Sequence, residues 1–130
     1  MKIAGLDHLV LTTDDLAACL KFYEEVLGME VRQTGNRYSL HFGKSKINIH
    51  TKPAEFLPPA KNPQSGALDI CFVVDEPIEE VYQELVAKGV TLETGIVERN
   101  GALGAMKSIY LRDPDGNLIE LCKYGDRDGR

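Results

Sequence analysis

Four side chains suited to binding a cation or moving a proton stand in four separate strand-like stretches of the sequence: His8, His50, Asp69 and Glu120. Two imidazoles and two carboxylates form a mixed nitrogen and oxygen ligand set that suits Zn, Ni, Co, Mn or Fe(II). Such a cation can hold two neighbouring substrate oxygens, polarise a carbonyl and stabilise an enediolate while a carboxylate nearby moves a proton. These residue types therefore indicate a catalytic divalent-metal site, with Glu120 as the proton-transfer residue.

Glu120 lies in the most distinctive stretch, where Asp-Pro-Asp-Gly-Asn at 113–117 precedes Leu-Ile-Glu-Leu at 118–121. The first five residues are typical of a turn and the next four of a strand. A carboxylate in an apolar strand must be solvated, paired or bound to a cation, because burying it alone is costly. Asp69 has a second interpretation, since an aspartate at the start of a strand often makes local backbone hydrogen bonds.

The elements that must position these residues occur in the same order twice. The first half predicts a strand at 3–12, a helix from Asp14 or Asp15 to Gly28, and strands at 29–34, 36–42 and 46–51. The second half predicts a strand at 67–74, a helix opened by Asp75 and Pro77 and closed by Gly89, and strands at about 90–97, 105–112 and 117–124. We expect a flexible glycine-rich loop at 100–104.

The two halves can be aligned by position. Gly28 and Gly89 are 61 positions apart, as are His8 and Asp69, and Ile49-His50 matches Ile119-Glu120 at an offset of 70. The sequence therefore predicts an α+β fold built from two βαβββ modules within a single domain. Module 1 spans about 1–52, a proline-rich linker about 53–66, module 2 about 67–124, and a frayed tail 125–130.

Strand alternation assigns the candidate residues to one face of each strand and the apolar residues to the other. The apolar face is expected to pack on the helices, and the polar face to be concave. His41 alternates with Leu40 and Phe42 and is expected to point to solvent. Arg37, Arg99 and Lys107 are candidate contacts for an anionic part of a substrate, with Arg99 and Lys107 in a mobile loop that closes over it.

Composition narrows the function class. The chain has 130 residues, 43% hydrophobic residues and a formal net charge of -5, which disfavours nucleic acid and anionic membranes as partners and favours a small-molecule substrate. No stretch approaches the length of a membrane span or resembles a signal peptide, so we expect a cytoplasmic protein. The three cysteines, Cys19, Cys71 and Cys122, are expected to be reduced and buried.

Three motifs resemble the vicinal oxygen chelate superfamily of glyoxalases, bleomycin-resistance proteins and extradiol dioxygenases. They are Leu-Asp-His-Leu-Val-Leu at 6–11, Phe-Tyr-Glu-Glu-Val-Leu-Gly-Met-Glu-Val at 22–31, and the ending at 112–121. The nearest resemblance is to the short lactoylglutathione-lyase-like group that includes virulence-associated and glyoxalase-domain proteins, through the stretches 46–50 and 68–71.

This resemblance implies two βαβββ modules whose mixed sheets curl around a metal-binding cleft, usually in a homodimer. It implies His8, His50, Asp69 and Glu120 as the metal-ligand positions. In glyoxalase I the fourth-strand residue is usually Glu and the fifth-strand residue His, so His50 and Asp69 exchange those types in this chain.

Three functions follow as alternatives. The first is a divalent-metal-dependent lyase or isomerase of glyoxalase type that works through an enediolate. The second is an extradiol-type Fe(II) ring-cleaving dioxygenase, because two histidines and one carboxylate also form the facial triad used with O₂. The third is a metal-free ligand-binding protein of the bleomycin-resistance type, which the retained ligand-type residues disfavour.

Overall fold

The computed structural model describes residues 1–125, and the chain divides into two compact units. Unit 1 comprises Met1–Leu68 together with Pro114–Gly116. Unit 2 comprises Asp69–Asp113 and the described residues from Asn117 to Gly125. The expected tail from 126 onward lies outside the described residues.

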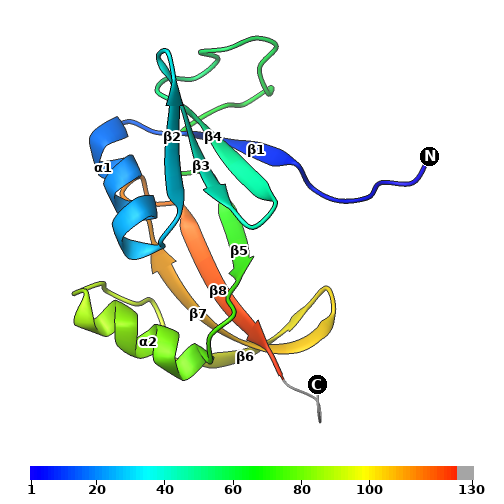
Figure 1. Ribbon diagram of the computed structural model, residues 1–130, viewed down its shortest axis with the longest axis vertical. Coiled ribbons are helices and arrows are strands. Elements are labelled where there is room, and N and C mark those ends of the chain that lie inside the picture. The colour runs from blue at the N-terminus through cyan, green and yellow to red at the C-terminus, as the bar shows by residue number, and fades with distance from the viewer. Residues whose placement is uncertain (126–130) are drawn as a thin grey trace. The chain divides into compact units, whose positions relative to one another are not determined.

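Unit 1 holds one helical segment and a four-stranded mixed sheet (Figure 1). Its elements are β1 (His8–Thr12), α1 (Leu16–Lys21), η1 (Phe22–Val26), β2 (Glu30–Thr34), β3 (Arg37–Phe42) and β4 (Ser45–His50). The strand order is β1-β4-β3-β2, with β1 parallel to β4 and the other pairs antiparallel. This is the βαβββ order that the sequence predicts.

Unit 2 repeats this topology. Its elements are β5 (Asp69–Val73), α2 (Ile78–Ala87), β6 (Val97–Gly101), β7 (Gly104–Arg112) and β8 (Leu118–Tyr124). The strand order is β5-β8-β7-β6, with β5 parallel to β8. The α+β class and the two βαβββ modules are therefore confirmed.

Local sequence explains where the first helical segment begins and ends. Asp15 is the N-cap of α1, and its Oδ1 accepts a hydrogen bond of 3.1 Å from the Ala18 amide. A single π-helical stretch, η1, continues α1. Gly28 then takes φ +71°, the left-handed conformation that favours glycine after a helix.

Alternation in the strands separates a buried apolar face from a polar face. In β4, Ile47 and Ile49 are buried, whereas Lys46, Asn48 and His50 are partly exposed. In unit 2, Ile119 and Leu121 of β8 are buried, and α2 packs against β7. Each fully buried Leu or Ile side chain contributes about 1.5–3 kcal/mol of hydrophobic stabilisation.

The turn at 113–117 makes side-chain hydrogen bonds in addition to reversing the chain direction. Buried Asp113 accepts hydrogen bonds from the backbone amide and side-chain amide of buried Asn117, at 2.9 and 2.7 Å. Within unit 1, Asp115 accepts from the Thr13 hydroxyl at 2.6 Å and from the Asp14 amide at 2.9 Å. This turn therefore fixes the segment between β1 and α1.

Residues 51–68 form an irregular connector, which confirms the absence of regular structure expected for the proline-rich stretch. Glu55 Oε1 holds its beginning by accepting from the Thr51 amide at 2.6 Å and the Thr51 hydroxyl at 3.1 Å. Ser65 donates to Asp14 Oδ2 at 2.7 Å near its end. Gly66 lies so close to Asp115 that an added Cβ would come within 2.6 Å of the Asp115 carbonyl oxygen.

Three local predictions were wrong. The first strand begins at His8 rather than residue 3, so His8 starts its strand instead of lying in the middle. The stretch 90–96 contributes one isolated bridge, Leu92 to Leu111, instead of a strand. The expected loop at 100–104 is the tip of a β6–β7 hairpin, because Gly104 adopts φ +122° and lets the strands reverse over two residues.

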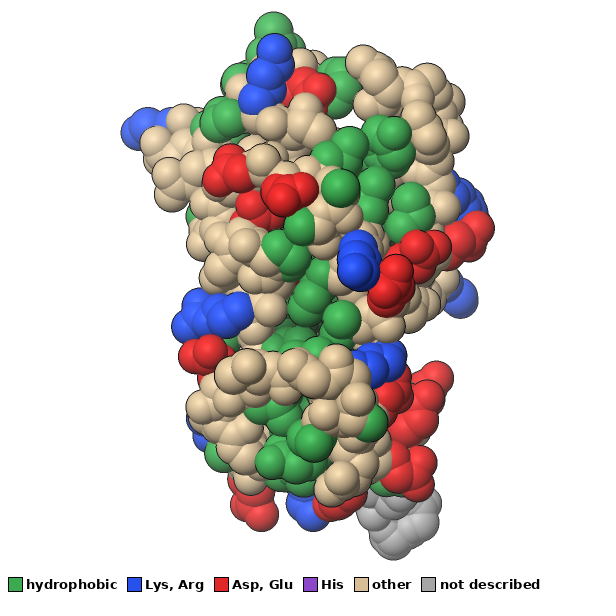
Figure 2. Space-filling view, turned by 90° about the vertical axis from the view of Figure 1, so that its left-hand side faces the viewer, with side chains coloured by type: hydrophobic (Ala, Val, Ile, Leu, Met, Phe, Trp, Pro, Cys, Tyr) green, Lys and Arg blue, Asp and Glu red, His purple; other side chains and the backbone are tan. Residues whose placement is uncertain are grey.

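Charged side chains of both signs occur on the surface. The face in Figure 2 carries acidic side chains in small groups, with basic and hydrophobic side chains beside them. Within residues 1–125, no helix is long and apolar enough to cross a membrane.

Candidate metal centre

The polar face of the unit 1 sheet carries all three histidines of the chain together with several charged residues. Its strand register places Lys46 beside both His8 and His41, and Asn48 beside both Val10 and Ser39. Because paired residues share a face, these side chains lie on the same side of the sheet. The opposite side is formed by the buried apolar residues Leu11, Leu40, Ile47 and Ile49.

His8 is exposed, and its ring is oriented by a neighbour. The His8 Nδ1 atom lies 2.8 Å from Asp7 Oδ2, and this hydrogen bond holds the pKa of the Asp7 carboxyl below its usual range. A metal-binding histidine commonly uses one ring nitrogen for the metal and gives the other to a carboxylate. The Asp7 contact therefore leaves Nε2 of His8 as the nitrogen available to a cation.

His8 and His50 are not brought together. His8 lies beside Lys46 and His50 beside Thr12, so the two histidines are four positions apart along neighbouring parallel strands. At about 3.3 Å per residue, this register separates them by about 13 Å along the strands. Since a His nitrogen must lie about 2.0–2.1 Å from zinc, two such parallel side chains do not converge on one ion.

Asp69 and Glu120 lie close together on the polar face of unit 2. Asp69 is beside Leu118, and Glu120 is beside Cys71, so the two carboxylates are diagonal neighbours on parallel strands. Asp69 is exposed, whereas the Oε2 atom of Glu120 is buried and has no hydrogen-bond partner among the residues that the structure describes.

A thiol pair lies next to these carboxylates. Cys71 is exposed and Cys122 is buried, so the prediction that all three cysteines are buried was wrong for Cys71. Partial desolvation of its sulfur, followed by a hydrogen bond with Cys122 and the charge of Glu120, raises the pKa of Cys71 to about 12. Burial also raises the pKa of Cys122. These thiols are therefore neutral near pH 7.

The strand register corrects the alignment of the two halves. His8 and Asp69 remain equivalent, but their partners Lys46 and Leu118 are 72 positions apart instead of 70. A second contact agrees, because the Thr13 amide donates to the His50 carbonyl and the Val74 amide to the Cys122 carbonyl.

At this offset Asn48, rather than His50, is equivalent to Glu120. Sequence reasoning missed Asn48 because a shift by two residues leaves the alternation of polar and apolar residues unchanged. The hydrogen-bond register is the signal that separates the two alignments.

The three candidate cationic residues have different surroundings. The Arg37 guanidinium carbon lies 4.0 Å from the centre of the Phe56 ring, in unit 1. Arg99 donates to the Tyr110 hydroxyl at 3.0 Å, and Tyr110 is beside Glu120, so Arg99 shares the polar face of unit 2. Lys107 alternates to the α2 side of that sheet and forms an ion pair of 3.6 Å with Glu79. The structure therefore does not place Lys107 with Glu120.

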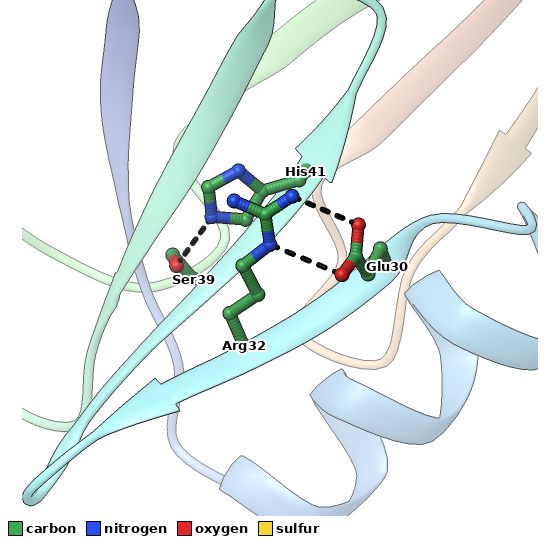
Figure 3. A network of polar contacts seen from close by, with 4 residues as sticks. All are labelled: Glu30, Arg32, Ser39 and His41. Carbon is green, nitrogen blue, oxygen red and sulfur yellow. Dashed lines mark hydrogen bonds and ion pairs between the residues drawn. The ribbon is translucent and has the colours of Figure 1, made fainter.

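His41 belongs to a polar network instead of pointing freely to solvent. Figure 3 shows His41 and Ser39 on β3 beside Arg32 and Glu30 on β2. His41 Nε2 and Ser39 Oγ are 2.8 Å apart, and Arg32 makes two hydrogen bonds of 3.1 Å to Glu30. The Arg32 contact lowers the pKa of the Glu30 carboxyl.

The donor set fits a divalent cation, although across the described chain no three His, Cys, Asp or Glu side chains form a ready-made metal cluster. The buried Glu120 Oε2 atom lacks the partner that a carboxylate oxygen requires. Nitrogen from His8 and oxygen from Asp69 and Glu120 are ligands that Zn, Ni, Co, Mn and Fe(II) accept.

A family model, described as the Glyoxalase/Bleomycin resistance protein/Dioxygenase superfamily, matches residues 5–121. The chain belongs to this superfamily. The match confirms the resemblance drawn from the three sequence motifs, which all lie within or at the borders of the matched region.

Two relatives resemble the chain over most of its length. Virulence protein STM3117 of Salmonella typhimurium is 48% identical over 95% of this chain and 87% of its own length. Its crystal structure gives a TM-score of 0.93 and covers 96% of this chain and 100% of the solved chain. Glyoxalase domain-containing protein RDO1 of Mycosarcoma maydis is 46% identical over 97% of this chain and 72% of its own length.

A solved structure of lower identity shares the fold. Lactoylglutathione lyase from Agrobacterium tumefaciens is 22% identical, with a TM-score of 0.73, and covers 95% of this chain and 96% of its own.

Proposed function

We propose that this protein is a divalent-metal-dependent lyase or isomerase of glyoxalase type, acting on a small substrate with two neighbouring oxygens. The observation that carries this proposal is the buried Oε2 atom of Glu120, which has no hydrogen-bond partner among residues 1–125. An ionised carboxylate oxygen in that position needs a cation or a proton to offset its lost hydration. Superfamily membership and the retained histidine of β1 point to the cation.

The ligand positions we propose are His8, Asp69 and Glu120. His8 is prepared for this role by Asp7, whose carboxylate occupies Nδ1 and leaves Nε2 free. Asp69 and Glu120 are diagonal neighbours on one face and together balance the charge of a divalent ion. His50 is left out of this set because the register holds it four positions from His8.

The proposed chemistry is proton transfer at carbon. A bound divalent cation would act as a Lewis acid toward a substrate carbonyl. Glu120 takes a proton from the carbon next to that carbonyl and returns it to the neighbouring carbon. Arg99, held by Tyr110 on the same face, provides a positive charge for an anionic part of the substrate.

Metal content tests this proposal directly. Native protein and the variants Glu120→Gln and His8→Gln are purified without an affinity tag and measured by elemental mass spectrometry. We expect near-stoichiometric metal in the native protein and affinities at least about tenfold weaker in both variants. The matched control is His41→Gln, which removes a histidine from the same unit 1 face without touching the proposed ligand set.

Two results would contradict the metal site. One is equal metal content in native protein and Glu120→Gln, and the other is no metal in native protein after reconstitution with Ni, Zn, Mn and Fe(II).

Activity is tested separately, by assaying the metal-loaded protein for isomerisation of the hemithioacetal of methylglyoxal and glutathione. If the metal-loaded protein consumes oxygen when catechols are added, the lyase proposal is wrong and the dioxygenase alternative is supported.

A further inference from the structure

Unit 1 contains a cavity of about 200 Å³ on its polar sheet face. The residues that matter for its chemistry are Arg37 and Ser39 of β3, Lys46, Asn48 and His50 of β4, and Phe56 of the connector. No carboxylate is among the residues that line it. Two permanent cations, a hydroxyl and an amide therefore face one small volume without an internal counterion.

The two cations differ in their surroundings, because Lys46 lies close enough to Asp7 to help lower the pKa of that carboxyl, whereas no such carboxylate neighbour is seen for Arg37 among the described residues. Arg37 stacks on Phe56 and, within the part of the chain described, neither Arg37 nor Lys46 forms an ion pair. Arg32, on the neighbouring strand, is neutralised by a two-pronged contact with Glu30. A planar guanidinium with free donors is suited to carboxylate and phosphonate oxygens.

A second cavity of about 210 Å³ adjoins this one, and His50 and Phe56 line both. Its walls are mainly apolar and come from β1 and the connector, including Val10, Pro58, Pro63 and Leu68. An apolar cavity of about 150 Å³ is large enough to hold benzene. The second cavity can therefore accept a six-membered ring or a short branched alkyl group.

We propose that unit 1 binds a small organic anion that carries one compact apolar group. The carboxylate or phosphonate lies at Arg37, with Lys46 further along the same cavity, and the apolar group lies behind Phe56 in the second cavity. His50 stands between the two parts as a substrate-binding residue rather than a metal ligand. This inference goes beyond the proposed function and does not rest on it, because every residue that lines the two cavities belongs to unit 1.

The position of Phe56 makes this division of the cavity specific. Its ring meets the Arg37 guanidinium at 4.0 Å and the His50 imidazole edge-on at 5.0 Å between ring centres. Glu55, the preceding residue, is held by two hydrogen bonds from Thr51. Contacts from the sheet and from the connector therefore hold the Phe56 ring between the two cavities. A ligand that occupies both cavities must place its charge on one side of this ring and its apolar group on the other.

Amide-resolved NMR titration of the metal-free full chain tests this inference. The probes are phenylphosphonate and benzoate, with methylphosphonate and acetate lacking the ring and benzyl alcohol lacking the charge. We expect at least one ring-bearing anion to bind about tenfold or more tightly than its ringless partner and than benzyl alcohol. The shifted amides should lie in β3, β4 and the connector.

The matched pair of variants is Arg37→Gln and Arg32→Gln, since both remove one exposed arginine from the same face. Arg37→Gln should weaken the ring-bearing anion about tenfold and leave benzyl alcohol unchanged, whereas Arg32→Gln should have little effect. Equal weakening by both variants, or ring-bearing anions that bind no better than ringless ones, would overturn the inference. Because the titration is done without metal, loss or retention of metal in Glu120→Gln does not alter its outcome.

Discussion

At the scale of single residues, equivalent polar positions in the two halves of the chain carry different residue types. Asp69 and Glu120 supply negative charge in unit 2, whereas their equivalents in unit 1 are His8 and Asn48. Equivalent positions therefore carry two carboxylates in one unit and an imidazole and an amide in the other.

The hydrogen bonds between buried Asp113 and Asn117 lead to a clear stability prediction. Asp113→Ala removes the acceptor of two hydrogen bonds and leaves the buried Asn117 amide groups short of partners. We expect a loss of about 1–3 kcal/mol in the free energy of unfolding. Urea denaturation followed by circular dichroism provides the measurement.

The control for this change is Glu84→Gln on α2, which breaks an exposed ion pair of 2.7 Å with Lys88. Exposed pairs of this kind contribute about 0.3–0.5 kcal/mol, so the control should be close to neutral. An Asp113→Ala protein as stable as the Glu84→Gln control would refute the importance given to this turn.

At the scale of elements, the beginning of the connector depends on the ionisation of Glu55. Hydrogen bonding from the Thr51 amide, aided by the Thr51 hydroxyl and the nearby charges of His50 and Lys52, lowers the pKa of the Glu55 carboxyl from its ordinary value of 4.5. A group with a lowered folded-state pKa stabilises the folded form above its ordinary pKa. That stabilisation is lost as the pH falls through the lowered value.

We therefore expect the Thr51 amide to lose its protection from hydrogen exchange, and its chemical shift to move, with a midpoint below pH 4.5. Glu55→Gln should abolish this titration and leave the amide poorly protected at neutral pH. An unchanged Thr51 amide between pH 6 and about pH 3, where an ordinary Glu is protonated, would show that Glu55 does not hold the connector.

The elements themselves were largely predictable, and the exceptions have physical causes. Helix ends followed from Asp15, Gly28 and Gly89, because capping and left-handed backbone depend on local residue type. The hairpin tip at 102–103 was predicted to be a flexible loop because glycines are common in flexible loops and in tight hairpin turns alike. Strand register was not predictable, since a two-residue slip keeps every side chain on its face and only pairing with the neighbouring strand decides it.

At the scale of the whole molecule, we expect a homodimer. β1 and β5 are edge strands of their respective sheets, and large apolar side chains beside or within them are exposed: Leu6 at 67% and Val73 at 64%. Exposed edges with apolar side chains favour pairing with another chain. Light scattering should give about twice the chain mass of 14.4 kDa.

The double variant Leu6→Lys/Val73→Lys should dissociate that dimer by placing charges at both edges. Val86→Lys is the control, because Val86 is 50% exposed but lies on α2, away from any strand edge. A native protein that scatters as a monomer, or a control that dissociates as readily as the double variant, would count against the expectation.

The sequence suggests candidate residues for the site, but strand register decides which of them are equivalent. Residue types and strand faces follow from local alternation, so His8, Asp69 and Glu120 can be named as candidates from the sequence alone. The exclusion of His50 and the equivalence of Asn48 with Glu120 depend on pairing between strands distant in sequence. The orientation of His8 by Asp7 was accessible in principle, because the two residues are adjacent.

The connector has a consequence for how this fold can diversify. It contributes Phe56, Pro58, Pro63 and Leu68 to the apolar cavity, yet residues 51–68 take part in no helix or strand. Substitutions there change the size and shape of the cavity without breaking a backbone ladder or opening either buried apolar face. Substitutions in this one segment can therefore change which ligands the cavity accepts, while the sheets and the proposed metal ligands stay unchanged. New ligand preferences can then evolve with little loss of stability.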